Sequence, residues 1–151
     1  MQGELIGIAS DHGGRELKKR VLAYLQEKNL EFKDYGVHPE QSGSVDYPDY
    51  GGPVAAAVSS GKLARGILIC GTGIGMCITA NKHPRVRAVS VWDEFTARVT
   101  RQHNNANIIC LGERVLNHDR ALDYLDIWLN TDFEPRHQNR LDKIHAIEKS
   151  R

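Results

Sequence analysis

The sequence has no long hydrophobic run, few cysteines and almost no net charge. No apolar segment approaches the ~20 residues of a membrane-spanning helix. We also expect no secretory signal, because the first residues lead straight into a strand-like segment. The three cysteines form no C-x-x-C pair, which argues against a disulfide framework and against a zinc ribbon. These absences predict a cytoplasmic protein.

The charge balance bears on the class of ligand. The 20 lysines and arginines against 19 acidic residues give a net charge of +1. A general nucleic-acid binder usually presents a strongly basic face, so this class is disfavoured, whereas a small anion needs only a few local cations. With 40% hydrophobic and 26% charged residues, the 151 residues are typical of one globular domain, residues 1–151, with its own core.

Apolar runs alternate with amphipathic segments along the chain. Strands are expected over residues 5–9, 32–35, 66–70, 86–91 and 106–111. Helices are expected over 15–29, 53–60, 93–103, 118–129 and 136–148, with a short one ending near residue 82 and a loop over 38–49. No two strands are joined by a hairpin signal. The pattern therefore predicts an α/β protein whose parallel sheet carries helices on both faces.

The glycine-rich turn from Cys70 to Gly75 follows a buried strand and precedes a helix. Ligands of open α/β sheets bind beyond the carboxyl ends of strands, and backbone N–H groups at a helix start attract anions. The turn matches neither a P-loop nor G-x-G-x-x-G, and it could serve only to pack the helix. Cys70 allows two interpretations. It is either a nucleophile or base, because a helix start favours the thiolate form, or it is simply a core cysteine. Cys77 and Cys110 are expected in the core.

Other polar groups also allow two interpretations. His12 beside Asp11 is either a carboxylate-oriented base or part of a helix cap. His103, at an expected helix end, could simply complement the helix dipole. Arg136 and Arg140, one helical turn apart, could grip one phosphate or form a solvated basic face. No H-x-x-x-H or HExxH motif is present, so metal binding is weakly supported.

Several motifs, in register from Ile6 to about Glu148, resemble the family of type B ribose-5-phosphate isomerases and of galactose- and allose-6-phosphate isomerases. They are Ser10-Asp11-His12-Gly13-Gly14, Asp46-Tyr47-Pro48, Cys70 to Gly75, Ala80-Asn81-Lys82, Arg101-Gln102-His103-Asn104 and Arg136-His137-Gln138-Asn139-Arg140. The resemblance implies a three-layer, Rossmann-like α/β/α sandwich with a five-stranded parallel sheet. It also implies a homodimer or tetramer with active sites shared between subunits, and neither metal nor organic cofactor.

The resemblance assigns roles to individual residues. Cys70 matches the general base that moves a proton between C1 and C2, and His103 matches the group that opens the sugar ring. The Thr72 hydroxyl assists an anion hole for the enediolate formed by Gly71, Gly73 and Gly75. Substrate contacts match Asp11, His12, Tyr47 and Asn104, and the phosphate cluster matches Arg114, Arg136 and Arg140.

The resemblance thus implies interconversion of D-ribose 5-phosphate and D-ribulose 5-phosphate through a cis-enediolate. Some family members carry Ser at the position of Cys70 and use a Glu directly after the last glycine as base. Here that residue is Met76, which cannot accept a proton, so Cys70 is the base candidate in the turn. The alternatives are an isomerase of a six-carbon sugar phosphate such as allose 6-phosphate and a non-catalytic sugar-phosphate sensor. The expected partners are a sugar phosphate and further copies of the chain, without nucleic acid or membrane.

Overall fold

A single parallel sheet organises the chain, which a computed structural model describes over residues 3–150. The strand order is β2-β1-β3-β5-β4, and every neighbouring pair is parallel. The strands are β1 (Ile6–Ser10), β2 (Phe32–Asp34), β3 (Arg65–Cys70), β4 (Ala88–Ser90) and β5 (Ile108–Gly112). The predicted α/β class and five-stranded parallel sheet are confirmed. Residues 1, 2 and 151 of the expected domain lie outside the described residues.

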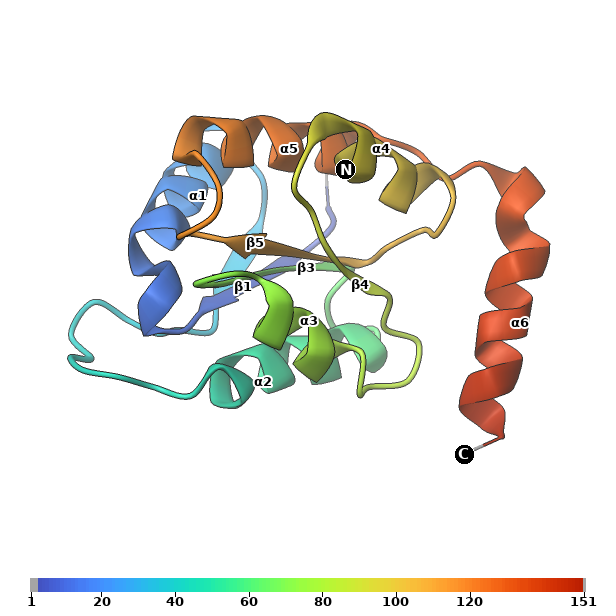
Figure 1. Cartoon of the computed structure of the whole chain (residues 1–151), viewed down its shortest axis with the longest axis horizontal. Helices are drawn as coiled ribbons and strands as arrows, with labels where there is room; N and C mark the ends of the chain where they lie inside the picture. Colours follow the sequence, from blue (N-terminus) through green and yellow to red (C-terminus); the bar gives the residue numbers. More distant parts are fainter. Residues whose placement is uncertain (1–2, 151) are drawn as a thin grey trace.

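Helices cover both faces of the sheet (Figure 1). One layer contains α1 (Arg15–Glu27), α4 (Glu94–Gln102) and α5 (His118–Asn130), and the opposite layer contains α2 (Tyr47–Ser59) and α3 (Ile74–Ala80). The last helix, α6 (Gln138–Lys149), stands to one side of the sandwich. Among the described residues, no helix is long and apolar enough to cross a membrane.

The alternation of side chains along β3 divides the core between the two faces. Ile67 and Ile69 are fully buried in the half formed with α1 and α5. Leu68 and Cys70 point the other way, into the half formed with α2 and α3. Because all six residues of β3 are buried, the strand needs no polar face, as expected for the middle of a parallel sheet. This register directs Cys70 toward the α3 side.

Two helix boundaries differ from the prediction. Helix α2 begins at Tyr47, six residues before the expected start, so the preceding loop is shorter than predicted. Pro48 lies in the first helical turn, where its missing N–H removes no helix hydrogen bond. The last predicted helix is broken, because residues Pro135–His137 form a short 3-10 turn and α6 starts at Gln138. Arg136 therefore lies outside the helix that carries Arg140.

Candidate functional site

Most of the predicted site residues lie where β1, β3 and β5 end. We call this set the strand-end group, and it consists of Asp11, His12, Tyr47, Cys70, Gly71, Thr72, Gly73, Gly75 and Arg114. The carboxyl ends of parallel strands meet at one edge of the sheet, which is where the fold is expected to bind ligands. The strand-end group therefore lies at the carboxyl ends of the strands, where a ligand is expected to bind.

The turn after β1 supports a capping role for Asp11 and a separate role for His12. Asp11 is buried, and its Oδ1 accepts a hydrogen bond from the Gly13 N–H at 2.8 Å. The His12 ring does not pair with this carboxylate. Its Nδ1 lies 3.0 Å from the carbonyl oxygen and 3.1 Å from the amide nitrogen of Val45. A loop backbone thus orients His12, and the interpretation of a carboxylate-oriented base is not supported.

Cys70 is the last residue of β3 and is only 4% exposed. Its sulfur accepts a hydrogen bond from the Gly73 N–H at 3.1 Å. Gly73 has φ +80°, a conformation that favours glycine, and this turns the backbone so that its N–H faces the sulfur. Cys70 is therefore packed in the core with its sulfur facing the backbone of the turn.

Two side chains lie directly against the glycines of the turn. A Cβ atom placed on Gly71 would be 3.2 Å from Arg114 Nη1, and one placed on Gly75 would be 2.8 Å from the Tyr47 ring. Thr72 is exposed, and its hydroxyl accepts a 3.3 Å hydrogen bond from the Ile74 N–H. The glycines therefore let an arginine and an aromatic ring approach the backbone closely, in addition to exposing N–H groups.

A second thiol lies near the turn. Cys77, on α3, is half-buried rather than fully inside the core as expected, whereas Cys110 is buried. The hydrogen bond with the Cys110 side chain is the main cause that lowers the pKa of Cys77 to about 6, against the opposing effect of burial. Burial in turn raises the pKa of Cys110. Experiments on Cys70 therefore need a Cys77 control.

The remaining predicted residues gather elsewhere, together with Glu134 and His137, which had no predicted role. We call this set the histidine–arginine group, and it consists of His103, Asn104, Glu134, Arg136, His137 and Arg140. The His103 ring lies against the buried His137 ring with centroids 4.4 Å apart. Arg136 donates from Nε and Nη2 to Glu134 Oε2, both at 2.7 Å, and Arg140 contacts His137 Nδ1. Asn104 is exposed.

The two groups lie at opposite ends of the parallel strands. Cys70 ends β3, whereas His103 and Asn104 come just before β5 begins, at the amino ends of the parallel strands. The six residues of β3 separate the two ends of the strands by about 20 Å. Figure 1 shows the same separation, with the turn before α3 at one side and the end of α4 at the other. One copy of the chain therefore does not bring Cys70 and His103 together.

The histidine–arginine group is better suited to an anion than to a metal ion. Donor atoms of His103, Glu134 and His137 lie within 4.8 Å of one another, as metal ligands would. However, Arg136 and Arg140 contact two of these three residues and add positive charge. Burial, followed by Arg136, lowers the pKa of His137 below its usual value. The arrangement favours a ligand such as a phosphate, whose oxygens match arginine donors.

Glu134 and His137 were missed as members of this group for different reasons. His137 stands inside the motif from Arg136 to Arg140, but neither its spacing nor the resemblance assigns it a role. Glu134 stands two residues before Arg136, a spacing that has no meaning on a continuous helix. The break between the 3-10 turn and α6 brings Glu134, Arg136 and His137 together, and Pro135 was the one sequence signal for that break.

Comparison with known proteins adds a consistent result. A family model described as Ribose/Galactose Isomerase matches residues 6–144. Ribose-5-phosphate isomerase B of Escherichia coli is 42% identical and covers 97% of both chains. The structure of ribose-5-phosphate isomerase B from Clostridium thermocellum superposes with a TM-score of 0.92 at 50% identity, covering 97% of this chain and 98% of that one.

A third relative was solved with a sugar phosphate. It is ribose-5-phosphate isomerase B from Mycoplasma genitalium with bound ribulose 5-phosphate. Its TM-score is 0.92 at 42% identity, and 97% of each chain is covered. Because the family model and these relatives span nearly the whole chain, this protein belongs to the ribose/galactose isomerase family and is an isomerase.

Proposed function

We propose that the protein interconverts D-ribose 5-phosphate and D-ribulose 5-phosphate as a homodimer. Each active site would combine the strand-end group of one copy with the histidine–arginine group of the other. One observation carries the proposal. The candidate base, Cys70, and the candidate ring-opening group, His103, lie at opposite ends of the parallel strands. Only a second copy brings such halves together. The bound ribulose 5-phosphate of the M. genitalium relative supports the choice of substrate.

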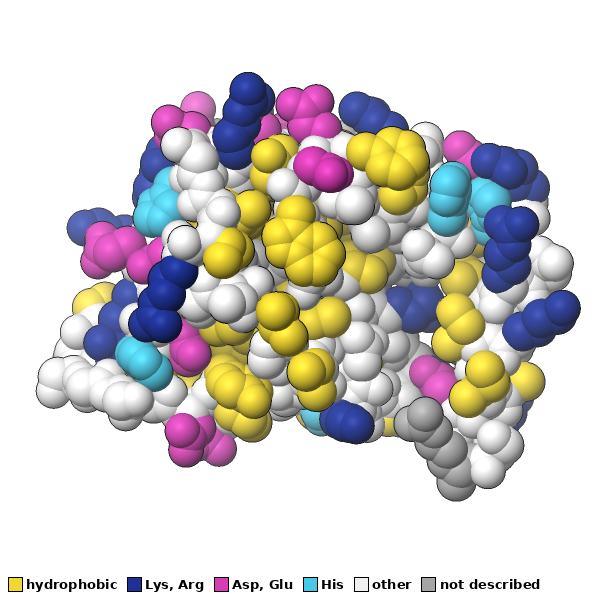
Figure 2. Space-filling view, viewed as in Figure 1, with side chains coloured by type: hydrophobic (Ala, Val, Ile, Leu, Met, Phe, Trp, Pro, Cys, Tyr) yellow, Lys and Arg dark blue, Asp and Glu magenta, His cyan; other side chains and the backbone are white. Residues whose placement is uncertain are grey.

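An exposed apolar patch offers a surface for the second copy. It consists of Ile74 and Ile78 on α3, Trp92 before α4 and Phe95 on α4, with exposed fractions between 51% and 71%. Figure 2 shows hydrophobic side chains gathered on this face, and β4 beside them is one of the two edge strands of the sheet. A patch of this kind usually marks an interface, and a two-fold axis pairs it with its own copy.

The cations on the two halves would hold the phosphate. Arg114 lies against the glycine turn of one copy, and Arg136 and Arg140 come from the other. Guanidinium groups suit a permanently charged phosphate, since each donates several hydrogen bonds in a fixed geometry. His12 adds a donor close to the turn. Since the phosphate lies far from C1 and C2, these contacts supply binding energy and orientation to the reaction.

The proton transfer would follow from the position of Cys70. His103 opens the furanose ring, and the Cys70 thiolate then removes the proton from C2 of the aldehyde form. The electron pair of that bond forms the cis-enediolate. The same proton then returns to C1 while the hydroxyl proton on O2 passes to O1, which gives the ketose. Backbone N–H groups of Gly71 and Gly75, with the Thr72 hydroxyl, would stabilise the negative oxygen, whereas the Gly73 N–H already donates to the Cys70 sulfur. Met76, directly after the last glycine, cannot accept a proton, so Cys70 is the base candidate in this turn.

The test compares isomerase turnover of the wild-type protein with that of Cys70→Ala, with EDTA present. We expect Cys70→Ala to lose on the order of 10³-fold in kcat, the usual contribution of a general base. It should still bind ribose 5-phosphate in calorimetry, because the phosphate contacts are unchanged. Cys77→Ser is the matched control and should keep wild-type turnover, since Cys77 lies on α3 outside the turn.

Other outcomes separate the alternatives. Normal turnover by Cys70→Ala would rule out the mechanism. A higher kcat/KM for allose 6-phosphate than for ribose 5-phosphate would instead indicate a six-carbon substrate. Binding of both sugars without turnover in the wild-type protein would identify a sensor. Loss of activity with EDTA would contradict a reaction that needs no metal.

A further inference from the structure

The loop between β2 and α2 is fastened to the turn that carries His12. We call residues 38–46 the strap. Arg15, three residues after His12, donates from Nη2 to the carbonyl oxygens of Gln41 at 2.5 Å and Gly43 at 3.1 Å. His12 itself contacts the backbone of Val45. Two side chains from one short segment thus hold the strap at three alternate residues.

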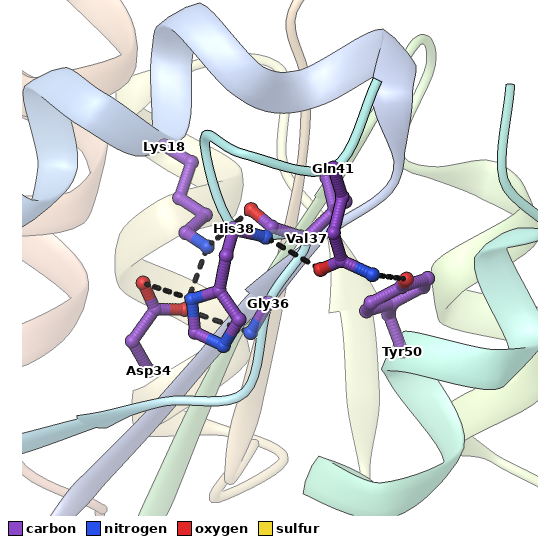
Figure 3. A network of polar contacts seen from close by, with 7 residues as sticks. All are labelled: Lys18, Asp34, Gly36, Val37, His38, Gln41 and Tyr50. Carbon is purple, nitrogen blue, oxygen red and sulfur yellow. Dashed lines mark hydrogen bonds and ion pairs between the residues drawn. The ribbon is translucent and has the colours of Figure 1, made fainter. Parts of the chain in front are cut away.

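The start of the strap is anchored independently of Arg15 (Figure 3). The buried Lys18 ammonium pairs with Asp34 at 2.6 Å and donates to the Val37 carbonyl at 3.0 Å. The Gln41 side chain accepts from the His38 N–H and donates to the Tyr50 hydroxyl, both at 3.0 Å. These contacts fix residues 37–41 against β2 and α2. Among the following residues, Arg15 holds Gly43 and His12 holds Val45.

The strap determines how His12 presents its second ring nitrogen. When Nδ1 accepts the Val45 N–H, a neutral His12 carries its proton on Nε2 and can donate there. When Nδ1 is protonated, the Val45 carbonyl accepts it instead. Val45 therefore satisfies Nδ1 in either protonation state, provided that its backbone stays in place. Two residues later the chain enters α2 with Tyr47, whose ring lies against Gly75.

The guanidinium of Arg15 has few other partners. Its Nε atom is buried and has no hydrogen-bond partner among residues 3–150. Both of its hydrogen bonds in this part of the chain go to strap carbonyls. A partly buried cation with so few partners depends strongly on those it has, because losing them would leave its charge poorly solvated. The geometry therefore couples Arg15 to the strap rather than to the rest of α1.

We propose that Arg15 is a positioning residue for the isomerase site. By holding the Gln41 and Gly43 carbonyls, it keeps Val45 in place and so fixes the orientation of His12 and the entry of Tyr47 beside the glycine turn. Arg15 acts through these residues and does not itself contact the reacting atoms. This role rests on the proposed function, in which His12 and Tyr47 contact the substrate.

The test compares Arg15→Ala with Arg20→Ala. Arg20 also lies on α1 and pairs through its guanidinium, but its partner is Asp119 on α5. We expect Arg15→Ala to lower kcat/KM for ribose 5-phosphate about tenfold, mainly through KM, since misplaced contacts weaken substrate binding and orientation. Hydrogen exchange at the Val45 amide should also accelerate, while exchange in α5 stays unchanged. Arg20→Ala should alter neither kcat/KM nor hydrogen exchange at the Val45 amide.

Each outcome bears on the proposal. Arg15→Lys should restore part of the loss, because an ammonium can donate to one of the two carbonyls, and it serves as the test if Arg15→Ala does not fold. Unchanged KM and unchanged Val45 exchange in Arg15→Ala would overturn the proposal, as would equal losses in Arg20→Ala. If the wild-type protein does not isomerise ribose 5-phosphate but Val45 exchange still responds to Arg15, the strap contact stands, while the proposed function and the positioning role resting on it fail.

Discussion

At the scale of single residues, sequence-local chemistry was predictable and long-range partners were not. Cys70 and the glycine turn form one contiguous segment, so their placement after a buried strand follows from the pattern alone. The sequence left His12 as either a base oriented by Asp11 or part of a helix cap, whereas its ring contacts Val45, which is 33 residues away. The two carbonyls that Arg15 holds are 26 and 28 residues away. Such contacts depend on where a loop crosses the sheet, which local patterns do not encode.

Glu134 leads to a prediction at this scale. Its carboxylate occupies the donors of Arg136 that the proposed function assigns to the substrate phosphate. Glu134→Gln removes this negative charge, so we expect KM for ribose 5-phosphate to fall about threefold, because like charges near one site weaken anion binding. The measurement is steady-state kinetics at low ionic strength. Asp142→Asn, a carboxylate on α6 that bonds Gln138, is the control and should leave KM unchanged. A rise in KM for Glu134→Gln would show that the carboxylate instead helps to orient Arg136.

At the scale of elements, the sequence predicted the existence and type of the strands and main helices, but misplaced two helix starts. Both errors involve proline. Pro48 marks the first turn of α2, whereas the prediction used Pro53, which lies inside the helix. Pro135 marks the 3-10 turn that separates Arg136 from α6. Proline fits the start of a helix and also interrupts one, so its presence alone does not decide which occurs.

Gly75 leads to a prediction for the contact between α2 and α3. Gly75→Ala places a methyl group about where the Tyr47 ring lies, since an added Cβ would be 2.8 Å from it. Because Gly75 is helical, alanine suits its backbone, and the cost falls on the position of Tyr47. We expect kcat/KM to fall about tenfold with little change in the unfolding midpoint in urea. Gly52→Ala, on α2 with no atom within 4 Å of the added Cβ, should keep full activity. Full activity in Gly75→Ala would mean that Tyr47 does not contribute to the site.

At the scale of the whole molecule, the fold class followed from the alternation of strands and helices, whereas the split of the candidate site did not follow from that pattern. The rule that ligands bind at the carboxyl ends of parallel strands located the strand-end group. That rule does not apply to His103, Arg136 and Arg140, which lie around the amino ends of the strands. In the proposed function these residues join Cys70 in a site built from two copies, which a pattern within one chain does not reveal.

Mixing two inactive variants tests this arrangement. In a dimer of one Cys70→Ala copy and one His103→Ala copy, one site carries both substitutions and the other carries neither. Unfolding and refolding an equal mixture yields about half mixed dimers, so we expect ~25% of wild-type activity to return. Each variant refolded alone should remain inactive. No recovery in a mixture shown to contain mixed dimers would mean that both residues act within the same copy.

The separation of the two groups also has a consequence for how activity depends on abundance. A newly made single chain would hold the candidate base at the carboxyl ends of its strands and the candidate ring-opening group at their amino ends, too far apart to act on one substrate. Below the dissociation constant of the pair, the rate of the reaction would rise with the square of the chain concentration instead of in proportion to it. A cell that halves its supply of the protein in that range would lose about three quarters of the flux.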